Sequence, residues 1–205
     1  MKTKVYEVKE VEEALQLAST EFGISEDELI EKIIRDKADG VDTMEVEITV
    51  CIDPIEKGKR YIQQILADNG VEGIIEKRVR DNVVELGVDA GDFNGVLIGK
   101  NSRHLSALQV LVSSIINKYY FEDEQIVVKV DVGGYRRRHE SNLERMAVEY
   151  GKQVAKTKQV IALDSLNAYE RKIIHDKLST WKDVYTHSEG EGTERILYIE
   201  PKKEK

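Results

Sequence analysis

Gly99 and Lys100 lie in a short break between two apolar stretches, and their residue types suit the binding of an anion. Gly99 has no Cβ, so another backbone can approach it closely. Lys100 adds a mobile positive charge, and Ser102 is a residue type that commonly caps the helix that follows. Free N–H groups and the positive end of a helix attract phosphate. The spacing therefore predicts a phosphate-binding loop. The alternative is an ordinary helix–helix turn that carries a solvated lysine.

A second pair with binding chemistry is Arg171 and His175, which are four residues apart and so share one face of a helix expected over 167–178. They flank the apolar stripe of Ile174 and Leu178, so we expect them near the edge of the buried surface. Arginine can pair bidentately with phosphate or stack on a base, and histidine can stack or donate a hydrogen bond. The alternative is a solvated helix face.

The densest basic run is Arg136, Arg137 and Arg138. On a helix these three side chains spread over roughly 200°, so they cannot all face one ligand. One or two of them are therefore expected to face solvent at the start of a helix. His104 and His139 have no partner pattern, and we expect them to be surface or packing residues.

The charge of the chain is unevenly distributed. The 205 residues carry 31 Lys and Arg against 39 Asp and Glu, a net charge of −8. Residues 1–53 hold 6 basic and 15 acidic side chains, a net charge of −9, and the remainder holds 25 and 24, a net charge of +1. Basic clusters beyond residue 53 can still bind phosphate despite the acidic total.

Several classes of protein are not indicated by the sequence. Cys51 is the single cysteine and cannot form an internal disulfide, and we expect no metal site and no cofactor. No stretch has the length and apolarity of a signal peptide or a membrane span, so we expect a cytoplasmic protein. We find no carboxylate pair, no nucleophile with a base and no P-loop, so we expect no enzymatic activity.

Hydrophobic periodicity predicts an α+β fold of three small modules, each a short sheet covered by helices on one face. The expected modules are residues 1–53, 54–132 and 133–205. The expected elements of the first are strand 3–9, helix 11–22, a helix over Leu29 to Ile34 started by a Ser25–Glu28 capping box, a turn at Asp39–Gly40, and strand 44–52. Those of the second are helix 55–69, strands 73–79 and 83–89, a short helix before Gly99, a helix to about 120, and strand 125–132. Those of the third are a long helix after Gly134, strand 159–163, helix 167–178 capped by Asn167, and strands 183–186 and 194–200.

The loop lies within a longer pattern, apolar-Ile-Gly-Lys-x-x-x-x-Leu-x-Ala-Leu-Gln, which ends at Gln109. This pattern resembles the K-homology (KH) domain of the bacterial type (type II), whose Gly-x-x-Gly loop clamps the backbone of a few nucleotides. Ser102 stands where the family has its second glycine. The resemblance implies nucleic-acid contacts from Ile98, Gly99, Lys100, Asn101, Ser102 and Arg103.

The Arg-x-x-x-His pair also lies within a longer match. The segments are YRRRHESNLERMA at 135–147, ERKIIH at 170–175 and SEGEG at 188–192. Together they resemble the R-three-H domain, which is associated with single-stranded nucleic acid. This resemblance implies contacts from Arg136, Arg137, Arg171 and His175.

The order of the three modules resembles the bacterial Jag family, the SpoIIIJ-associated proteins. The resemblance implies a non-catalytic protein that binds single-stranded RNA, with single-stranded DNA as a further ligand, and that regulates cell elongation, division or sporulation. It also implies a membrane-protein insertase or another protein as partner of residues 1–53, recruitment to the membrane, and homo-oligomers as a further state. The alternative is a protein-interaction adaptor in which the KH fold is structural, and Ser102 and the acidic N-terminal segment favour it.

Overall fold

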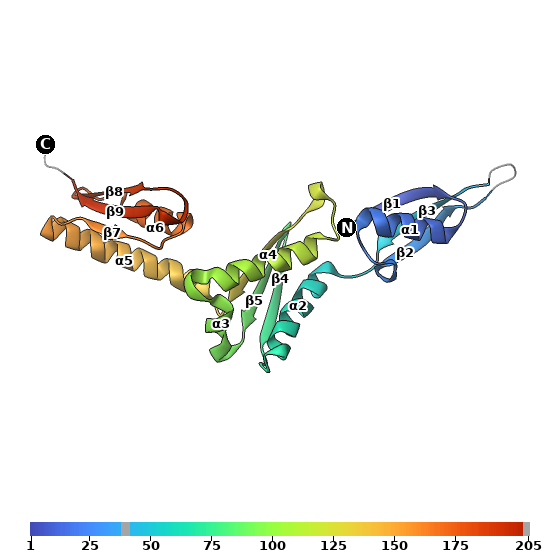
Figure 1. The fold of residues 1–205 in the computed structure, drawn as a ribbon, viewed down its shortest axis with the longest axis horizontal. Coiled ribbons are helices and arrows are strands. Elements are labelled where there is room, and N and C mark those ends of the chain that lie inside the picture. The colour runs from blue at the N-terminus through green and yellow to red at the C-terminus, as the bar shows by residue number, and fades with distance from the viewer. Residues whose placement is uncertain (38–41, 203–205) are drawn as a thin grey trace. The chain divides into compact units, whose positions relative to one another are not determined.

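The computed structural model describes residues 1–37 and 42–202, and the chain divides into two compact units, residues 1–133 and 134–205 (Figure 1). Both units combine α-helices with three-stranded sheets, which confirms the predicted α+β class. The turn predicted at Asp39–Gly40 lies outside the described residues.

The first sheet is built by the N-terminal residues of unit 1. The elements are β1 (Thr3–Val8), α1 (Val11–Phe22), β2 (Leu29–Arg35) and β3 (Met44–Val50). The strands are antiparallel in the order β1-β3-β2, so β3 is central. Alternation along β3 buries Val46, Ile48 and Val50 on one face, where Ala14 and Ala18 of α1 join the same core.

The prediction of a helix over Leu29–Ile34 is wrong, because these residues form strand β2. Spacings of three and four residues between these apolar side chains suit a helix. The backbone instead pairs with the edge of β3 from Leu29 to Arg35, with one register shift after Ile33. Leu29 is buried opposite Val50, whereas Ile30, Ile33 and Ile34 are about half exposed. The side chain of Ser25 caps nothing, and Glu26–Glu28 form a single 3-10 turn.

The second sheet of unit 1 follows directly. Its elements are α2 (Pro54–Asp68), β4 (Ile74–Arg80), β5 (Val83–Asp89), α3 (Asn94–Ile98), α4 (Arg103–Asn117) and β6 (Val127–Val132). The strand order is β4-β5-β6, with β4 antiparallel and β6 parallel to β5. The apolar stripe of α4 and the alternating apolar residues of β5 and β6 are buried together. Helices α2 and α4 are in close contact at Gly58, where a Cβ would lie 2.7 Å from the side chain of Ile116.

Tyr119 and Phe121 connect the two sheets of unit 1. They lie between α4 and β6 in sequence, yet both pack in the core of the N-terminal sheet. The ring of Phe121 meets Phe22 edge to face with centroids 5.9 Å apart, and the Lys2 N–H donates to the Tyr119 carbonyl at 2.9 Å. Residues 1–53 therefore complete their core with residues from the neighbouring segment.

Residues 134–202 of unit 2 form one sheet and two α-helices. Its elements are α5 (Tyr135–Thr157), β7 (Ile161–Leu163), α6 (Ala168–Leu178), β8 (Val184–Glu189) and β9 (Ile196–Pro201). The antiparallel strand order is β7-β9-β8, and β8 extends three residues beyond its predicted end. Leu197 and Ile199 of β9 pack against Leu143 and Ala147 of α5 and Ile174 of α6.

Candidate nucleic-acid interface

The loop between α3 and α4 has an unusual backbone conformation. Gly99 has φ +69°, and Asn101 and Ser102 have φ 53° and 58°. Positive φ favours glycine, so position 102 has the conformation that suits the second glycine of the KH pattern. The resulting sharp turn leaves Lys100, Asn101 and Arg103 exposed, with Ile98 and Ser102 half-buried.

Ser102 does not play the predicted capping role. A capping residue normally has an extended backbone, whereas Ser102 is left-handed and its side chain makes no capping hydrogen bond to α4. The N-terminus of this 15-residue helix is therefore without a side-chain cap. Its first-turn N–H groups lie next to Lys100 and Arg103, an arrangement that favours a phosphate.

His104 holds the loop in place through contacts with Val96 and Gly99, which the sequence did not predict. Its Nδ1 lies 2.7 Å from the carbonyl oxygen of Val96, and its ring is so close to Gly99 that a Cβ there would meet Cγ at 2.5 Å. Gly99 is thus required by the packing of His104 as well as by its own positive φ. The place of a histidine in the first turn after a glycine loop was the available signal.

In unit 2 the structure places Arg171 and His175 on α6, at the edge of the core as their spacing predicted. Arg171 is half-buried, and its guanidinium donates to the carbonyl of Leu166 at 2.6 Å. His175 is exposed, and its Nδ1 lies 2.6 Å from the hydroxyl of Thr186 on β8. These contacts hold both side chains in place, and each uses only part of its hydrogen-bonding capacity.

His139 is the second histidine that the sequence analysis did not assign. Its Nε2 lies 2.6 Å from Glu170, a carboxylate that is only 6% exposed. The ring of Tyr135 stacks on His139 with centroids 5.1 Å apart, and Glu170 also accepts from the N–H of Asn167, which completes the predicted cap of α6. The first turns of α5 and α6 are therefore joined.

This junction brings the arginine run near the start of α6. Arg136, Arg137 and Arg138 are all exposed on the first turn of α5. The Tyr169 hydroxyl on α6 donates to Glu140 on α5 at 2.6 Å, and this hydrogen bond raises the pKa of Tyr169. Residues 134–205 carry 15 Lys and Arg against 12 Asp and Glu, a net charge of +3.

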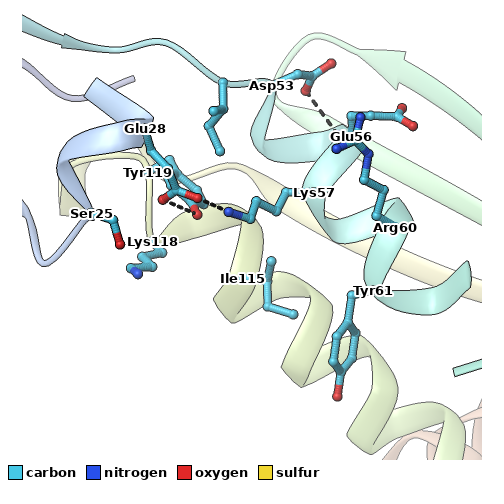
Figure 2. Close-up of a pocket in the computed structure, with 11 residues that line it drawn as sticks. Ser25, Glu28, Asp53, Glu56, Lys57, Arg60, Tyr61, Ile115, Lys118 and Tyr119 are labelled. Carbon is cyan, nitrogen blue, oxygen red and sulfur yellow. Dashed lines mark hydrogen bonds and ion pairs between the residues drawn. The ribbon is translucent and has the colours of Figure 1, made fainter. Parts of the chain in front are cut away.

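Unit 1 also contains a cleft of about 790 Å³ that the sequence analysis did not anticipate. Figure 2 shows Glu28 from the N-terminal segment pointing at Lys57 of α2 and at Tyr119. The Tyr119 hydroxyl donates to Glu28 at 3.0 Å, and Lys57 forms an ion pair with the same carboxylate. Since the carboxylate is mostly buried, these two partners compensate its loss of hydration. The contact is part of the junction between the two sheets.

The chain is similar to known proteins over most of its length. Residues 141–201 match the R-three-H domain, so Arg171 and His175 lie inside the match and Arg136 and Arg137 precede it. The RNA-binding protein KhpB of Clostridium symbiosum is 35% identical over 150 residues, which cover 73% of this chain and 67% of the relative. The RNA-binding protein KhpB of Bacillus subtilis (strain 168) is 30% identical over 203 residues, which cover 95% of this chain and 96% of the relative. The chain belongs to the KhpB family. The predicted Jag-type family membership is thereby confirmed.

Within the described residues of this KhpB-family chain, no group of three or more His, Cys, Asp or Glu side chains is arranged to bind a metal ion. Among their helices, none has the length and apolarity needed to cross a membrane.

Proposed function

We propose that this chain binds single-stranded RNA without catalysing a reaction, through the loop of residues 98–103 and through α6. The observation that carries the proposal is the exposed pair Lys100 and Arg103 beside the uncapped start of α4. A sharp turn with two cations and a helix N-terminus suits a phosphodiester backbone. The R-three-H match and the names of the relatives support the same function.

The second surface consists of Arg171 and His175, with Arg136 and Arg137 near the start of the same helix. An arginine held at one end by a backbone carbonyl retains other N–H groups for phosphate or a base. When two modest sites on one chain engage the same strand, the second contact forms at a high effective concentration. Neither site then needs to be tight, and single-stranded DNA is expected as a further ligand.

The test uses the full chain and a fluorescein-labelled pool of random 20-nucleotide single-stranded RNA. Fluorescence anisotropy should show binding that weakens with salt, with a log–log slope of about −0.7 per phosphate contacted. Duplex RNA of the same length should bind more weakly, because stacking on Arg171 or His175 needs unpaired bases. Salt-independent binding, or none to the pool, would contradict the proposal.

The second candidate function, an adaptor that recruits a protein partner, rests on the acidity of residues 1–53. A net charge of −9 disfavours RNA there and favours a partner with a basic surface. An insertase partner and membrane recruitment belong to this candidate. Control of cell elongation, division or sporulation belongs to the RNA-binding proposal, and homo-oligomers are a further expected state.

Substitutions that remove negative charges test this candidate better than a deletion does. Deletion of residues 1–53 would expose the side chains of Tyr119 and Phe121 to solvent. The exposed residues Glu12, Glu13 and Glu26 can be changed to Gln together. RNA affinity should stay the same or rise slightly as the repulsion decreases. A marked loss of RNA affinity would contradict the assignment of residues 1–53 to protein contacts.

A further inference from the structure

The sheet of unit 2 has one face that its helices do not cover. Leu197 and Ile199 point from β9 into the core with α5 and α6, so Tyr198 between them points to the opposite face. His187 lies directly across from Tyr198 on β8, and Tyr185 lies two residues before His187 on the same side. This open face therefore has an aromatic row that the Arg-x-x-x-His pair does not include.

The three rings of this row form one stack. Tyr185 and His187 are 5.7 Å apart between centroids with an interplanar angle of 19°, and His187 and Tyr198 are 5.3 Å apart at 17°. The Nδ1 atom of His187 is buried between its neighbours and finds no hydrogen-bond partner within the described residues. Stacking, together with a 3.2 Å contact from Nε2 to Glu189, thus holds the imidazole in place.

Beyond Tyr198 the row ends at a small side chain. Ala162 of β7 is the residue paired with Tyr198, and it is exposed. A methyl group cannot cover the outer face of the Tyr198 ring, so a flat group the size of a nucleobase fits above Ala162 and extends the stack. Val160, just before β7, is 51% exposed and adds apolar surface at the end of this strand.

Charges around the row favour bases over phosphates. Glu189 and Glu200 flank it, and they already accept hydrogen bonds from His187 and from the hydroxyl of Tyr185. Carboxylates repel a phosphate but accept from the exocyclic amines of bases. The contact expected here is therefore stacking of an unpaired base, which every base can make through its π-face.

We infer that the open face formed by Ala162, Tyr198, His187 and Tyr185 is a stacking site for unpaired bases of single-stranded RNA. This inference rests on the proposed function. Thr186, the neighbour of Tyr185 and His187 on the edge strand β8, bonds to His175 on the helix side. One RNA strand that crosses the β8 edge and continues along the row to Ala162 on β7 contacts α6 through phosphate and the open face through a base.

The test fills the space above Ala162 with Ala162→Leu in the full chain and uses Ala162→Ser as the matched control. Binding of the random 20-nucleotide RNA pool and of an abasic ribose-phosphate 20-mer is measured by anisotropy. The leucine variant should bind the RNA pool roughly five- to a hundredfold more weakly, the range expected for one lost base stack. Its salt slope and its affinity for the abasic strand should not change, because no phosphate contact is removed.

The outcomes separate the inference from the proposed function. An unchanged thermal unfolding midpoint for Ala162→Leu, with the loss confined to the base-containing RNA, supports the stacking site. RNA binding at wild-type affinity by Ala162→Leu overturns the site while the proposed function stands. A leucine variant that fails to fold is replaced by Tyr198→Leu, which removes the ring and should give the same base-dependent loss. A wild-type chain that binds neither probe overturns the proposed function as well.

Discussion

At the scale of single residues, the loop conformation explains why position 102 matters. A left-handed backbone costs a non-glycine residue roughly 1–2 kcal/mol. Asn101 also has a positive φ, and asparagine tolerates this region better than serine because a short amide side chain can hydrogen-bond to the nearby backbone. Ser102 therefore stores strain at the point where the KH pattern has glycine.

Ser102→Gly should stabilise the chain by about 0.5–1 kcal/mol, because the relief of strain exceeds the extra entropy of glycine in the unfolded state. Urea denaturation measures the change. Ser106→Gly is the matched control. Ser106 faces solvent in the middle of α4, so glycine there should lower the free energy of unfolding by about 1 kcal/mol. A stability change of the same sign in both variants would show that the backbone of residue 102 is not strained. Tighter RNA binding by the first variant would show that the side chain holds the strand away.

At the scale of elements, the start of α2 has a cap that follows from its sequence. Asp53 accepts from the N–H groups of Ile55 and Glu56 at 2.8 and 3.2 Å, and Lys77 lies 3.5 Å from its carboxylate. Burial raises the pKa of Asp53, but the two backbone hydrogen bonds and Lys77 outweigh it, so the pKa lies below the ordinary 3.8. The folded state thus favours the ionised form.

Asp53→Ala should destabilise the chain by about 1 kcal/mol near pH 7. A lowered folded-state pKa gives stability that is present above the unfolded pKa and is lost as the pH falls through the folded one. The difference in unfolding free energy between wild type and Asp53→Ala should therefore shrink as urea titrations move from about pH 5 toward about pH 2.5. Asp53→Asn keeps a side-chain oxygen that can accept the backbone hydrogen bonds, so it should lower the free energy of unfolding less than Asp53→Ala does. A difference that grows in acid would contradict the assigned cap.

Elements with a strong local signal were predictable, and those decided by distant partners were not. The periodic stripe of α4 and the cap predicted at Asn167 gave the right helices within a few residues at their ends. Strand β2 was missed because its backbone pairs with β3, and no local pattern reports that partner. The contacts of His104 and His139 were missed for the same reason, since Val96 and Glu170 are their partners only in the folded chain.

At the scale of the whole molecule, Tyr119 makes the two sheets of unit 1 depend on each other. Its ring is 3% exposed in the core of the N-terminal sheet, although it follows α4 in sequence. The net charge changes after residue 53, and the strands that follow belong to a second sheet. Both sheets nevertheless lie in one compact unit that continues to Gly133. A cooperative unit of this kind should unfold in one step.

Tyr119→Ala should destabilise unit 1 by about 3–5 kcal/mol, the cost of truncating a buried aromatic side chain. Amide hydrogen exchange should show protection lost together in β3 and in α4. Tyr119→Phe is the control, because it keeps the ring and removes only the bond to Glu28, for a loss of about 1–3 kcal/mol. Loss of protection in β3 alone would show that the N-terminal sheet unfolds independently.

The central claim is that the loop before α4 and the face of α6 bind the same RNA strand. The decisive measurement is the affinity and salt slope of Lys100→Gln, Arg171→Gln and the double variant for 20-nucleotide single-stranded RNA, with Lys32→Gln on β2 as control. Glutamine removes each charge and keeps a hydrogen-bond donor, but it is two bonds shorter than arginine, so Arg171→Gln also gives up the contact to Leu166. The account predicts that each single variant weakens binding and lowers the slope by about 0.7, that the free-energy losses add in the double variant, and that the control binds as wild type. Wild-type affinity in either single variant would contradict simultaneous binding at both surfaces.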